Sequence, residues 1–290
     1  MRQCGQRGRA ASIQSKILTI KNNFMFGAVM SNEENCRLLL ERILDERISS
    51  VTVSKEKSIV YHPGYKGIRL DVYANDLEDT YYNVEMQVLK EPAPGKRSRY
   101  YHSQMDMELL SAGKKYEDLP NTYVIFICDY DPFGFGKYRY IFKNRCAEDG
   151  RVELQDGSQT IFLNTHGTNE DEVSEELVKF LKFVKADLSE SEDDFGDYYV
   201  ESLQEHIRNL KQSREMGERF MLFEELLEME RRQTKLTERI ETILEFLEEL
   251  GTIPDDLKQC IISEDDLDVL KDWLKIAARA TTIEEFEQNM

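Results

Sequence analysis

The spacing of apolar and polar residues changes along the chain from helical to strand-like. We expect a helix over about residues 22–30 and a second helix that opens at a capping box, Ser31 with Glu34 three residues later, and ends near Arg47. The apolar stripe of the second helix consists of Leu39, Leu40, Ile43 and Leu44. From residue 50 the period becomes two, over 51–54 and partly over 68–74, which predicts strands.

The segment 81–89 shows this alternation well, with Val84 and Met86 on one side and Glu85 and Gln87 on the other. A continuous apolar run over 121–128 is typical of a buried central strand. We expect further elements as a helix over about 100–115 and strands over 138–143 and 160–164. Helices and strands in this order predict an α/β domain built in layers.

Beyond residue 169 the strand pattern disappears. We expect a short helix over 175–186, an acidic linker over 189–197 and a helical region over 198–250. Within it a heptad pattern steps by alternating four and three residues through Leu222, Leu226, Met229, Gln233, Leu236, Ile240, Ile243, Leu247 and Leu250. Two interpretations stay open: a coiled coil that makes a homodimer or higher oligomer through 222–250, or one amphipathic helix lying on the body. We expect a small helical unit over 266–287 with Trp273 in its core.

Composition excludes several classes of protein. The longest apolar run in the 290 residues is six, over 123–128, too short to cross a membrane. The basic start of the chain lacks the apolar stretch of a secretory signal. Five scattered cysteines favour a reduced, cytoplasmic protein rather than a disulfide scaffold. The glycines at 134–136 lack the spacing of a phosphate-binding loop, so we expect no nucleotide cofactor.

The net charge of −18 is unevenly distributed. Residues 170–290 carry 34 acidic and 15 basic residues, a net of −19, so residues 1–169 carry a net of +1. The acidity therefore belongs to the C-terminal part and does not exclude an N-terminal domain that faces DNA.

Two acidic residues are the main candidates for chemistry. If the strands around Glu78 form a hairpin centred on that residue, Asp71 lies opposite Glu85, with β-carbons about 4.5–5.5 Å apart. Two such carboxylates repel each other, and a divalent cation between them removes the repulsion. Mg²⁺, which takes carboxylate, water and phosphate oxygens, suits this position. Gln87 lies on the same face as Glu85 and adds a polar group to the same site.

These residues resemble the PD-(D/E)XK nuclease superfamily, and in particular its recombination-promoting nuclease and putative transposase family. The resemblance runs from residue 22 to about Gly167, roughly half of the chain. Its matching pieces are Asn22-Asn-Phe-Met-Phe-Gly, Ile68-Arg-Leu-Asp-Val-Tyr, Asn83-Val-Glu-Met-Gln and Lys96-Arg-Ser-Arg-Tyr-Tyr-His-Ser-Gln-Met.

The resemblance implies a restriction-endonuclease-like core, with a central mixed sheet flanked by helices, and Mg²⁺-dependent DNA cleavage linked to recombination or mobile elements, with Mn²⁺ as a substitute. It implies Asp71, Glu85 and the Met86 carbonyl as metal ligands, and Gln87 where the superfamily more often has Lys. Relatives often carry an acid where this chain has Asn23, and Glu34 and Glu41 are possible replacements. The basic, aromatic cluster Lys96, Arg97, Arg99 and Tyr100 is expected to contact DNA phosphates, or else to be a solvated helix end.

We thus expect a basic lead-in over 1–15, a nuclease-like domain over 16–190 and an acidic, helical, partly coiled-coil region over 191–290. The alternative function is a catalytically inert nuclease fold that binds nucleic acid or protein partners. Sequence preference and nicking versus double-strand cleavage are not readable from the sequence, and nothing in it is specific for strand transfer.

Overall fold

The computed structural model describes residues 18–54, 57–59 and 68–290, so the predicted lead-in over 1–15 lies outside the described residues. The chain divides into two compact units, Met1–Gly217 and Glu218–Met290. Each unit has its own hydrophobic core. Among the described residues, no helix is both long and apolar enough to span a membrane.

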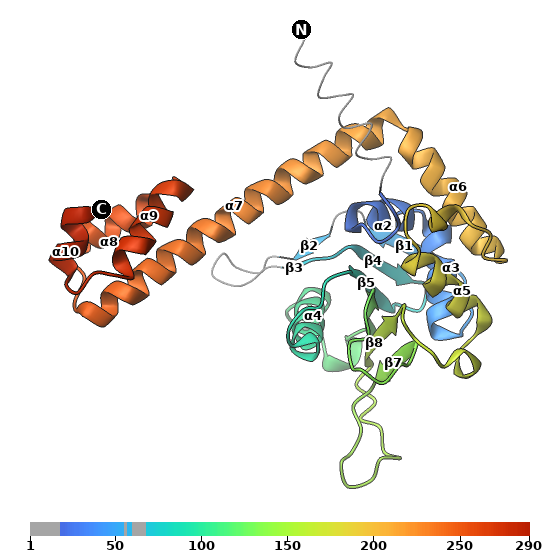
Figure 1. The fold of residues 1–290 in the computed structure, drawn as a ribbon. Coiled ribbons are helices and arrows are strands. Elements are labelled where there is room, and N and C mark those ends of the chain that lie inside the picture. The colour runs from blue at the N-terminus through green and yellow to red at the C-terminus, as the bar shows by residue number, and fades with distance from the viewer. Residues whose placement is uncertain (1–17, 55–56, 60–67) are drawn as a thin grey trace. The chain divides into compact units, whose positions relative to one another are not determined.

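A six-stranded mixed sheet forms the centre of the first unit (Figure 1). Its strands, in spatial order, are β1 (Val51–Ser54), β4 (Val72–Asp76), β5 (Tyr81–Gln87), β6 (Thr122–Cys128), β8 (Ser158–Asn164) and β7 (Arg139–Phe142). β5 and β8 both run parallel to β6, whereas the other pairs are antiparallel. A separate two-stranded ribbon joins β2 (Ser58–Ile59) and β3 (Ile68–Arg69).

Helices cover both faces of this sheet. One face packs against α2 (Asn23–Met30), α3 (Glu33–Leu44), α5 (Glu175–Lys185) and α6 (Tyr198–Gln212), and the other packs against α4 (Pro94–Leu109). Val84 and Met86 of β5 point into the core beneath α2, α3, α5 and α6. The alternate residues of that strand therefore point toward α4. The predicted α/β layers and the mixed sheet between helices are confirmed. Short 3₁₀ turns occur at Tyr116–Asp118, Glu170–Glu172 and Glu190–Glu192.

Three predicted helix boundaries were wrong: both ends of α3 and the start of α4. α3 is capped by Asn32, whose side chain accepts a bond from the backbone N–H of Asn35 at 3.0 Å, and it ends at Leu44 because Asp45 adopts a left-handed conformation. Ser31 instead follows α2 as its C-terminal cap. α4 begins at Pro94, six residues before the expected start, because proline is favoured in the first helical turn.

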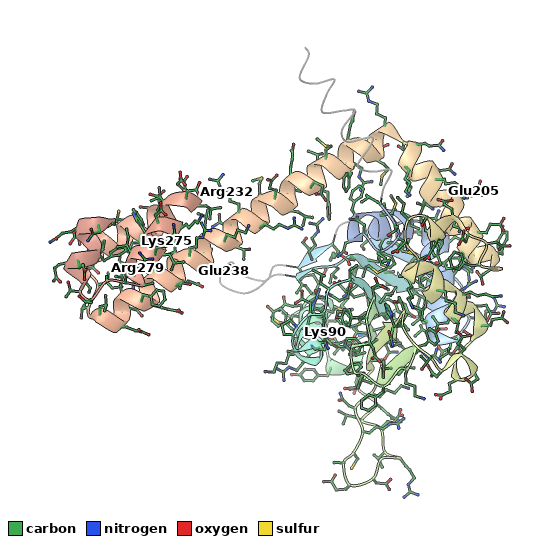
Figure 2. The ribbon with its side chains drawn as sticks, in the orientation of Figure 1. Lys90, Glu205, Arg232, Glu238, Lys275 and Arg279 are labelled. Atoms are coloured by element: carbon green, nitrogen blue, oxygen red, sulfur yellow. The ribbon has the colours of Figure 1, made fainter. Side chains whose placement is uncertain are left out.

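The second unit is entirely helical. α7 (Arg214–Leu250) begins in the first unit and continues through the second, where α8 (Asp255–Ser263), α9 (Leu267–Ala277) and α10 (Ile283–Asn289) follow. Leu236, Ile243 and Leu247 of α7 pack in one core with Trp273 and Phe286. Charged side chains such as Arg232, Glu238 and Lys275 lie exposed on these helices (Figure 2).

The division between the units lies later in the sequence than expected. Tyr199, Val200, Leu203 and Ile207 of α6 are buried in the core of the first unit. The nuclease-like body thus includes α6, whereas the sequence analysis placed residues from 191 onward in the C-terminal region.

Candidate active site

The hairpin of β4 and β5 has the predicted register. Val72 pairs with Val84 and Tyr73 pairs with Asn83. Asp71, the residue before β4, therefore lies beside Glu85. Two hydrogen bonds fix the pair: the N–H of Asp71 donates to Oε1 of Glu85 at 3.3 Å, and the N–H of Met86 donates to Oδ2 of Asp71 at 3.0 Å. The two predicted acidic residues therefore lie next to each other where the strands separate.

The two carboxyl groups are removed from solvent to different degrees, because Glu85 is buried and Asp71 is half-buried. Glu85 is only 2% exposed because α4 covers its face of the sheet. Burial raises the pKa of Glu85 well above its ordinary value, and the charge of Asp71 raises it further, against the lowering effect of Arg97. Burial also raises the pKa of Asp71, which the N–H of Met86 and the Arg97 guanidinium oppose. The site therefore stabilises its negative charges incompletely, which favours the binding of a cation.

Arg97 occupies a central position in this site. From the first turns of α4 its Nη2 donates to Oε2 of Glu85 at 3.2 Å and to the hydroxyl of Tyr101 at 2.8 Å. Its Nη1 donates to Oε1 of Gln87 at 2.5 Å. Gln87 also donates from Nε2 to the carbonyl of Leu89 at 2.9 Å. Both ends of the Gln87 amide are thus engaged by this chain.

Asn23 joins the site from α2. Its Nδ2 donates to Oδ2 of Asp71 at 3.2 Å, so Asn23 acts here as a hydrogen-bond donor to the carboxylate. Gly27 lies one turn later, where an added β-carbon would come within 3.3 Å of the Asp71 carbonyl. The glycine therefore allows α2 to pack closely against the residue that it orients.

Glu34 and Glu41 interact elsewhere. Both bind Arg37 on the same helix, at 2.7 and 2.8 Å, and Glu41 also accepts a bond from the N–H of Ile48. Of the three proposed substitutes for the family's early acid, the structure joins only Asn23 to Asp71 by a hydrogen bond.

Comparison with known protein families gives one match. The PD-(D/E)XK nuclease family transposase model covers residues 20–245, more than three quarters of the chain. The chain belongs to this family. It therefore has a nuclease-like function related to mobile elements. The comparison with curated proteins found no match, and neither did the comparison with solved structures.

The candidate site offers hard oxygen donors of the kind that Mg²⁺ prefers. Asp71 and Glu85 supply two carboxylates. The Met86 carbonyl lies on the same strand edge as the Met86 N–H that binds Asp71, since both groups of one residue in a strand point to one edge. No group of three His, Cys, Asp or Glu side chains able to hold a metal occurs in the described part of the chain. The donor set thus fits a metal that takes two carboxylates and completes its shell with water and phosphate.

One residue of the candidate site, Tyr101, was not predicted from the sequence. The hydroxyl of Tyr101 lies 3.4 Å from Oε2 of Glu85 and accepts a bond from Nε of Arg97 at 3.1 Å. The spacing of four residues between Arg97 and Tyr101, which places both on one helix face, was the available signal. Lys96 and Arg99 are exposed on the same turn, while Tyr100 packs partly against the core beneath α4.

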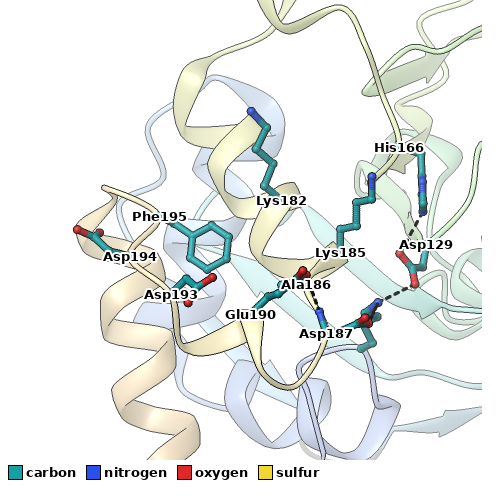
Figure 3. A pocket seen from close by; sticks show the side chains of 11 residues that line it. Asp129, His166, Lys182, Lys185, Ala186, Asp187, Glu190, Asp193, Asp194 and Phe195 are labelled. Carbon is teal, nitrogen blue, oxygen red and sulfur yellow. Dashed lines mark hydrogen bonds and ion pairs between the residues drawn. The ribbon is translucent and has the colours of Figure 1, made fainter.

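A pocket of about 570 Å³ lies at the end of the sheet where β5 and β6 finish, and Asp129 is one of its lining residues (Figure 3). The N–H of Asp129, directly after β6, donates to the carbonyl of Gln87 at 3.0 Å. Its carboxylate binds Lys21 at 3.0 Å, accepts a bond from Thr165 at 2.9 Å and lies 3.5 Å from Nε2 of His166. Five acidic side chains, three lysines and one histidine line this pocket, so its charges are mixed with an acidic excess.

Proposed function

We propose that this protein is a DNA endonuclease that depends on a divalent metal, Mg²⁺ with Mn²⁺ as a substitute. One observation carries the proposal: two carboxylates, the buried Glu85 and the half-buried Asp71, lie together at the open end of the β4–β5 hairpin beside an arginine. A metal bound there would lower the pKa of its water and polarise a phosphodiester.

The residues of the chain have separable roles in this proposal. Asp71 and Glu85 hold the cation, with the Met86 carbonyl as a third ligand. Asn23 orients the Asp71 carboxylate through its hydrogen bond. Tyr101 stays neutral, because burial and the adjacent Glu85 raise its pKa to about 12, and it donates to Glu85. Gln87 belongs to the site through its contact with Arg97.

DNA is the proposed substrate because of the charges around the start of α4. Lys96 and Arg99 are exposed there and Arg97 is partly exposed, while Tyr100 lies at the edge of the core. Cations at the beginning of a helix, where backbone N–H groups also point outward, are suited to phosphate oxygens. We assign phosphate contacts to Lys96, Arg97, Arg99 and Tyr100.

Supercoiled plasmid tests the proposal. The wild type is expected to nick or linearise it in Mg²⁺ or Mn²⁺ and to be inactive in EDTA. Asp71→Asn and Glu85→Gln should each lose at least about 10²-fold in rate, since each removes a ligand charge while keeping its shape. Glu78→Gln, in the exposed turn of the same hairpin, is the matched control and should cut like the wild type. Cleavage that persists in both ligand variants would contradict the proposed site.

The second candidate is an inert nuclease fold that serves as an interaction module. It is favoured by the lack, among the described residues, of a third acid near Asp71 and Glu85. A folded wild type that binds DNA but cleaves neither plasmid nor linear or single-stranded DNA in either metal would favour this candidate over the endonuclease. Joining of DNA ends in the same assay would instead indicate strand transfer.

We further propose that the protein acts as a homodimer or higher oligomer and works in the cytoplasm. Leu222, Leu226 and Met229 of α7 follow the heptad pattern and are 60%, 58% and 67% exposed. Two nuclease units joined through this stretch would place two sites on one duplex. The four described cysteines are free thiols, in keeping with a reducing compartment.

A further inference from the structure

We infer that Arg97 is the cation that contacts the phosphate undergoing cleavage, and that Gln87 is a positioning residue that holds Arg97 in place. This inference rests on the proposed function. It assigns to an arginine from α4 the positive charge that the strand residue at position 87 cannot provide, because a neutral amide carries none.

The contacts of Gln87 show that it positions Arg97. Its Oε1 accepts the 2.5 Å bond from Arg97, and its Nε2 donates to the Leu89 carbonyl. One donor and one acceptor position of the amide are thus occupied within the protein, which limits how far Gln87 can turn toward a water or a phosphate. The same two bonds, however, fix the position of the guanidinium.

The guanidinium is held on several sides. It bonds Glu85 and Tyr101, and its Cζ lies 5.2 Å from the ring centre of Tyr101 and 5.6 Å from that of Phe126. These hydrogen bonds account for Nε–H, both N–H groups of Nη2 and one of Nη1, within the described part of the chain. One N–H on Nη1 remains, and the side chain is 31% exposed. Arg97 is thus rigid and still has a donor for a ligand.

The net charge of the metal-loaded site depends on Arg97. Two carboxylates and one divalent cation sum to zero formal charge, so without Arg97 the loaded site would attract a phosphodiester anion only through direct coordination to the metal. With Arg97 the site becomes positive by one charge, at a position that burial partly shields from solvent. The exposed Lys96 and Arg99 add only solvent-screened charge.

The geometry also explains why position 87 is neutral. A lysine there would place an ammonium against the Arg97 guanidinium, at the position from which Oε1 now accepts a hydrogen bond. Gln87→Lys should therefore be harmful in the wild type, through repulsion of Arg97. In an Arg97→Met background the same lysine has no cation to repel and should replace the missing charge.

The test uses five full-length proteins: wild type, Arg97→Met, Gln87→Lys, the double variant, and Arg151→Met as a control that removes an exposed arginine from the loop over 143–157. Binding to a 30-base-pair duplex in Ca²⁺ is measured against salt concentration, and single-turnover cleavage is measured in Mg²⁺. Loss of one phosphate contact lowers the slope of log K against log salt by about 0.9.

Arg97→Met should lower the slope by about one and slow cleavage by about 10²-fold or more, the effect of one preorganised donor. Gln87→Lys alone should also impair both readouts, and the double variant should exceed either single variant. The control should match the wild type. Folding is checked by melting temperature, and Arg97→Gln, which removes the charge but keeps a polar side chain, replaces Arg97→Met if the latter does not fold.

Two results would overturn the inference: a folded Arg97→Met protein with unchanged slope and rate, or a double variant worse than both single variants. If the wild type binds DNA but does not cleave it, the proposed endonuclease function fails. The binding arm still decides then whether Arg97 contacts a phosphate.

Discussion

Glu85 shows how a single buried carboxyl group can lower the stability of this fold. Its carboxyl is buried against another carboxyl, and Arg97 is the cation bonded to it. A group whose folded pKa lies above its unfolded value contributes full stability only while it is protonated. As pH rises from the unfolded value of about 4.3 through the higher folded value, that contribution is lost.

Glu85→Gln should therefore stabilise the metal-free protein above neutral pH. The isosteric amide keeps the shape and removes the charge, so we expect a gain of about 1–2 kcal/mol at pH 8, on the scale of 1.4 kcal/mol per pKa unit. The gain should shrink as pH falls toward 4.5, where the wild-type carboxyl is protonated. Urea unfolding in EDTA across this range measures it. A variant less stable than the wild type at pH 8 would contradict the electrostatic account.

Added metal should reverse the order of stability of the wild type and Glu85→Gln. Mn²⁺ should raise the melting temperature of the wild type, because it binds only the folded state, and should leave Glu85→Gln nearly unchanged.

Residue-level prediction from the sequence succeeded where the backbone determines the answer. The number of residues in the hairpin sets its register, and the pairing of Tyr73 with Asn83 confirms the placement of Asp71 beside Glu85. The bond between Gln87 and Arg97 was not predictable, because it depends on how α4 folds back over β5. A basic cluster in a sequence does not reveal which of its members turns inward.

At the scale of elements, the position of α4 on the sheet determines the geometry of the site. His102 bonds the hydroxyls of Thr122 on β6 and Thr160 on β8, at 2.9 and 3.1 Å, and Ser98 also bonds Thr160. This polar contact lies one turn beyond Arg97 on the same helix. The expected start of α4 at residue 100 would have left Arg97 outside the helix, so its role depends on the correction.

His102 should make the first unit sensitive to acid. Burial lowers the pKa of His102 to about 4, whereas an unfolded histidine titrates near 6.5. A histidine whose pKa is lowered in the folded state contributes stability at pH values above its unfolded pKa. This contribution is lost as pH falls from about 6.5 toward 4. The loss amounts to about 3 kcal/mol at most, from a difference of roughly 2.5 pKa units.

Chemical denaturation of wild type and His102→Gln between pH 7.5 and 4.5 measures this effect. The variant is expected to be less stable at neutral pH, and the difference should narrow on acidification. Because Asp71 and Glu85 titrate in both proteins, their contributions cancel in the comparison. A difference that stays constant with pH would contradict the assignment to His102.

At the scale of the whole molecule, the heptad pattern of α7 divides into a buried part and an exposed part. Leu236, Ile243 and Leu247 pack against the helices α8–α10 of the same chain, which the heptads alone did not predict. Heptad positions look the same whether a neighbouring segment or a second chain covers them, so the sequence could not distinguish these cases. Within the heptad pattern, Leu222, Leu226 and Met229 remain as an exposed apolar stripe, which we propose as the contact with a second copy of the chain.

Self-association through this stripe is the last prediction. The stripe from 222 to 233 spans fewer than two heptads, short of the three or four typical of a stable coiled coil, so we expect dimers that form at about micromolar concentrations. Leu226→Asp with Met229→Asp should give a monomer by light scattering while the melting temperature stays within about 2 °C, because both side chains are exposed. Leu247→Asp is unsuitable as a probe, since it would disrupt a buried core.

Leu77→Asp is the matched control, because Leu77 is 79% exposed in the β4–β5 turn and outside the stripe. It should leave the dimer unchanged. If two sites act on one duplex, the monomeric variant should still nick plasmid but linearise it more slowly, since the second cut then needs a second encounter. A wild type that stays monomeric at about 100 μM, or a double variant that stays dimeric, would move the interface away from α7 or remove it.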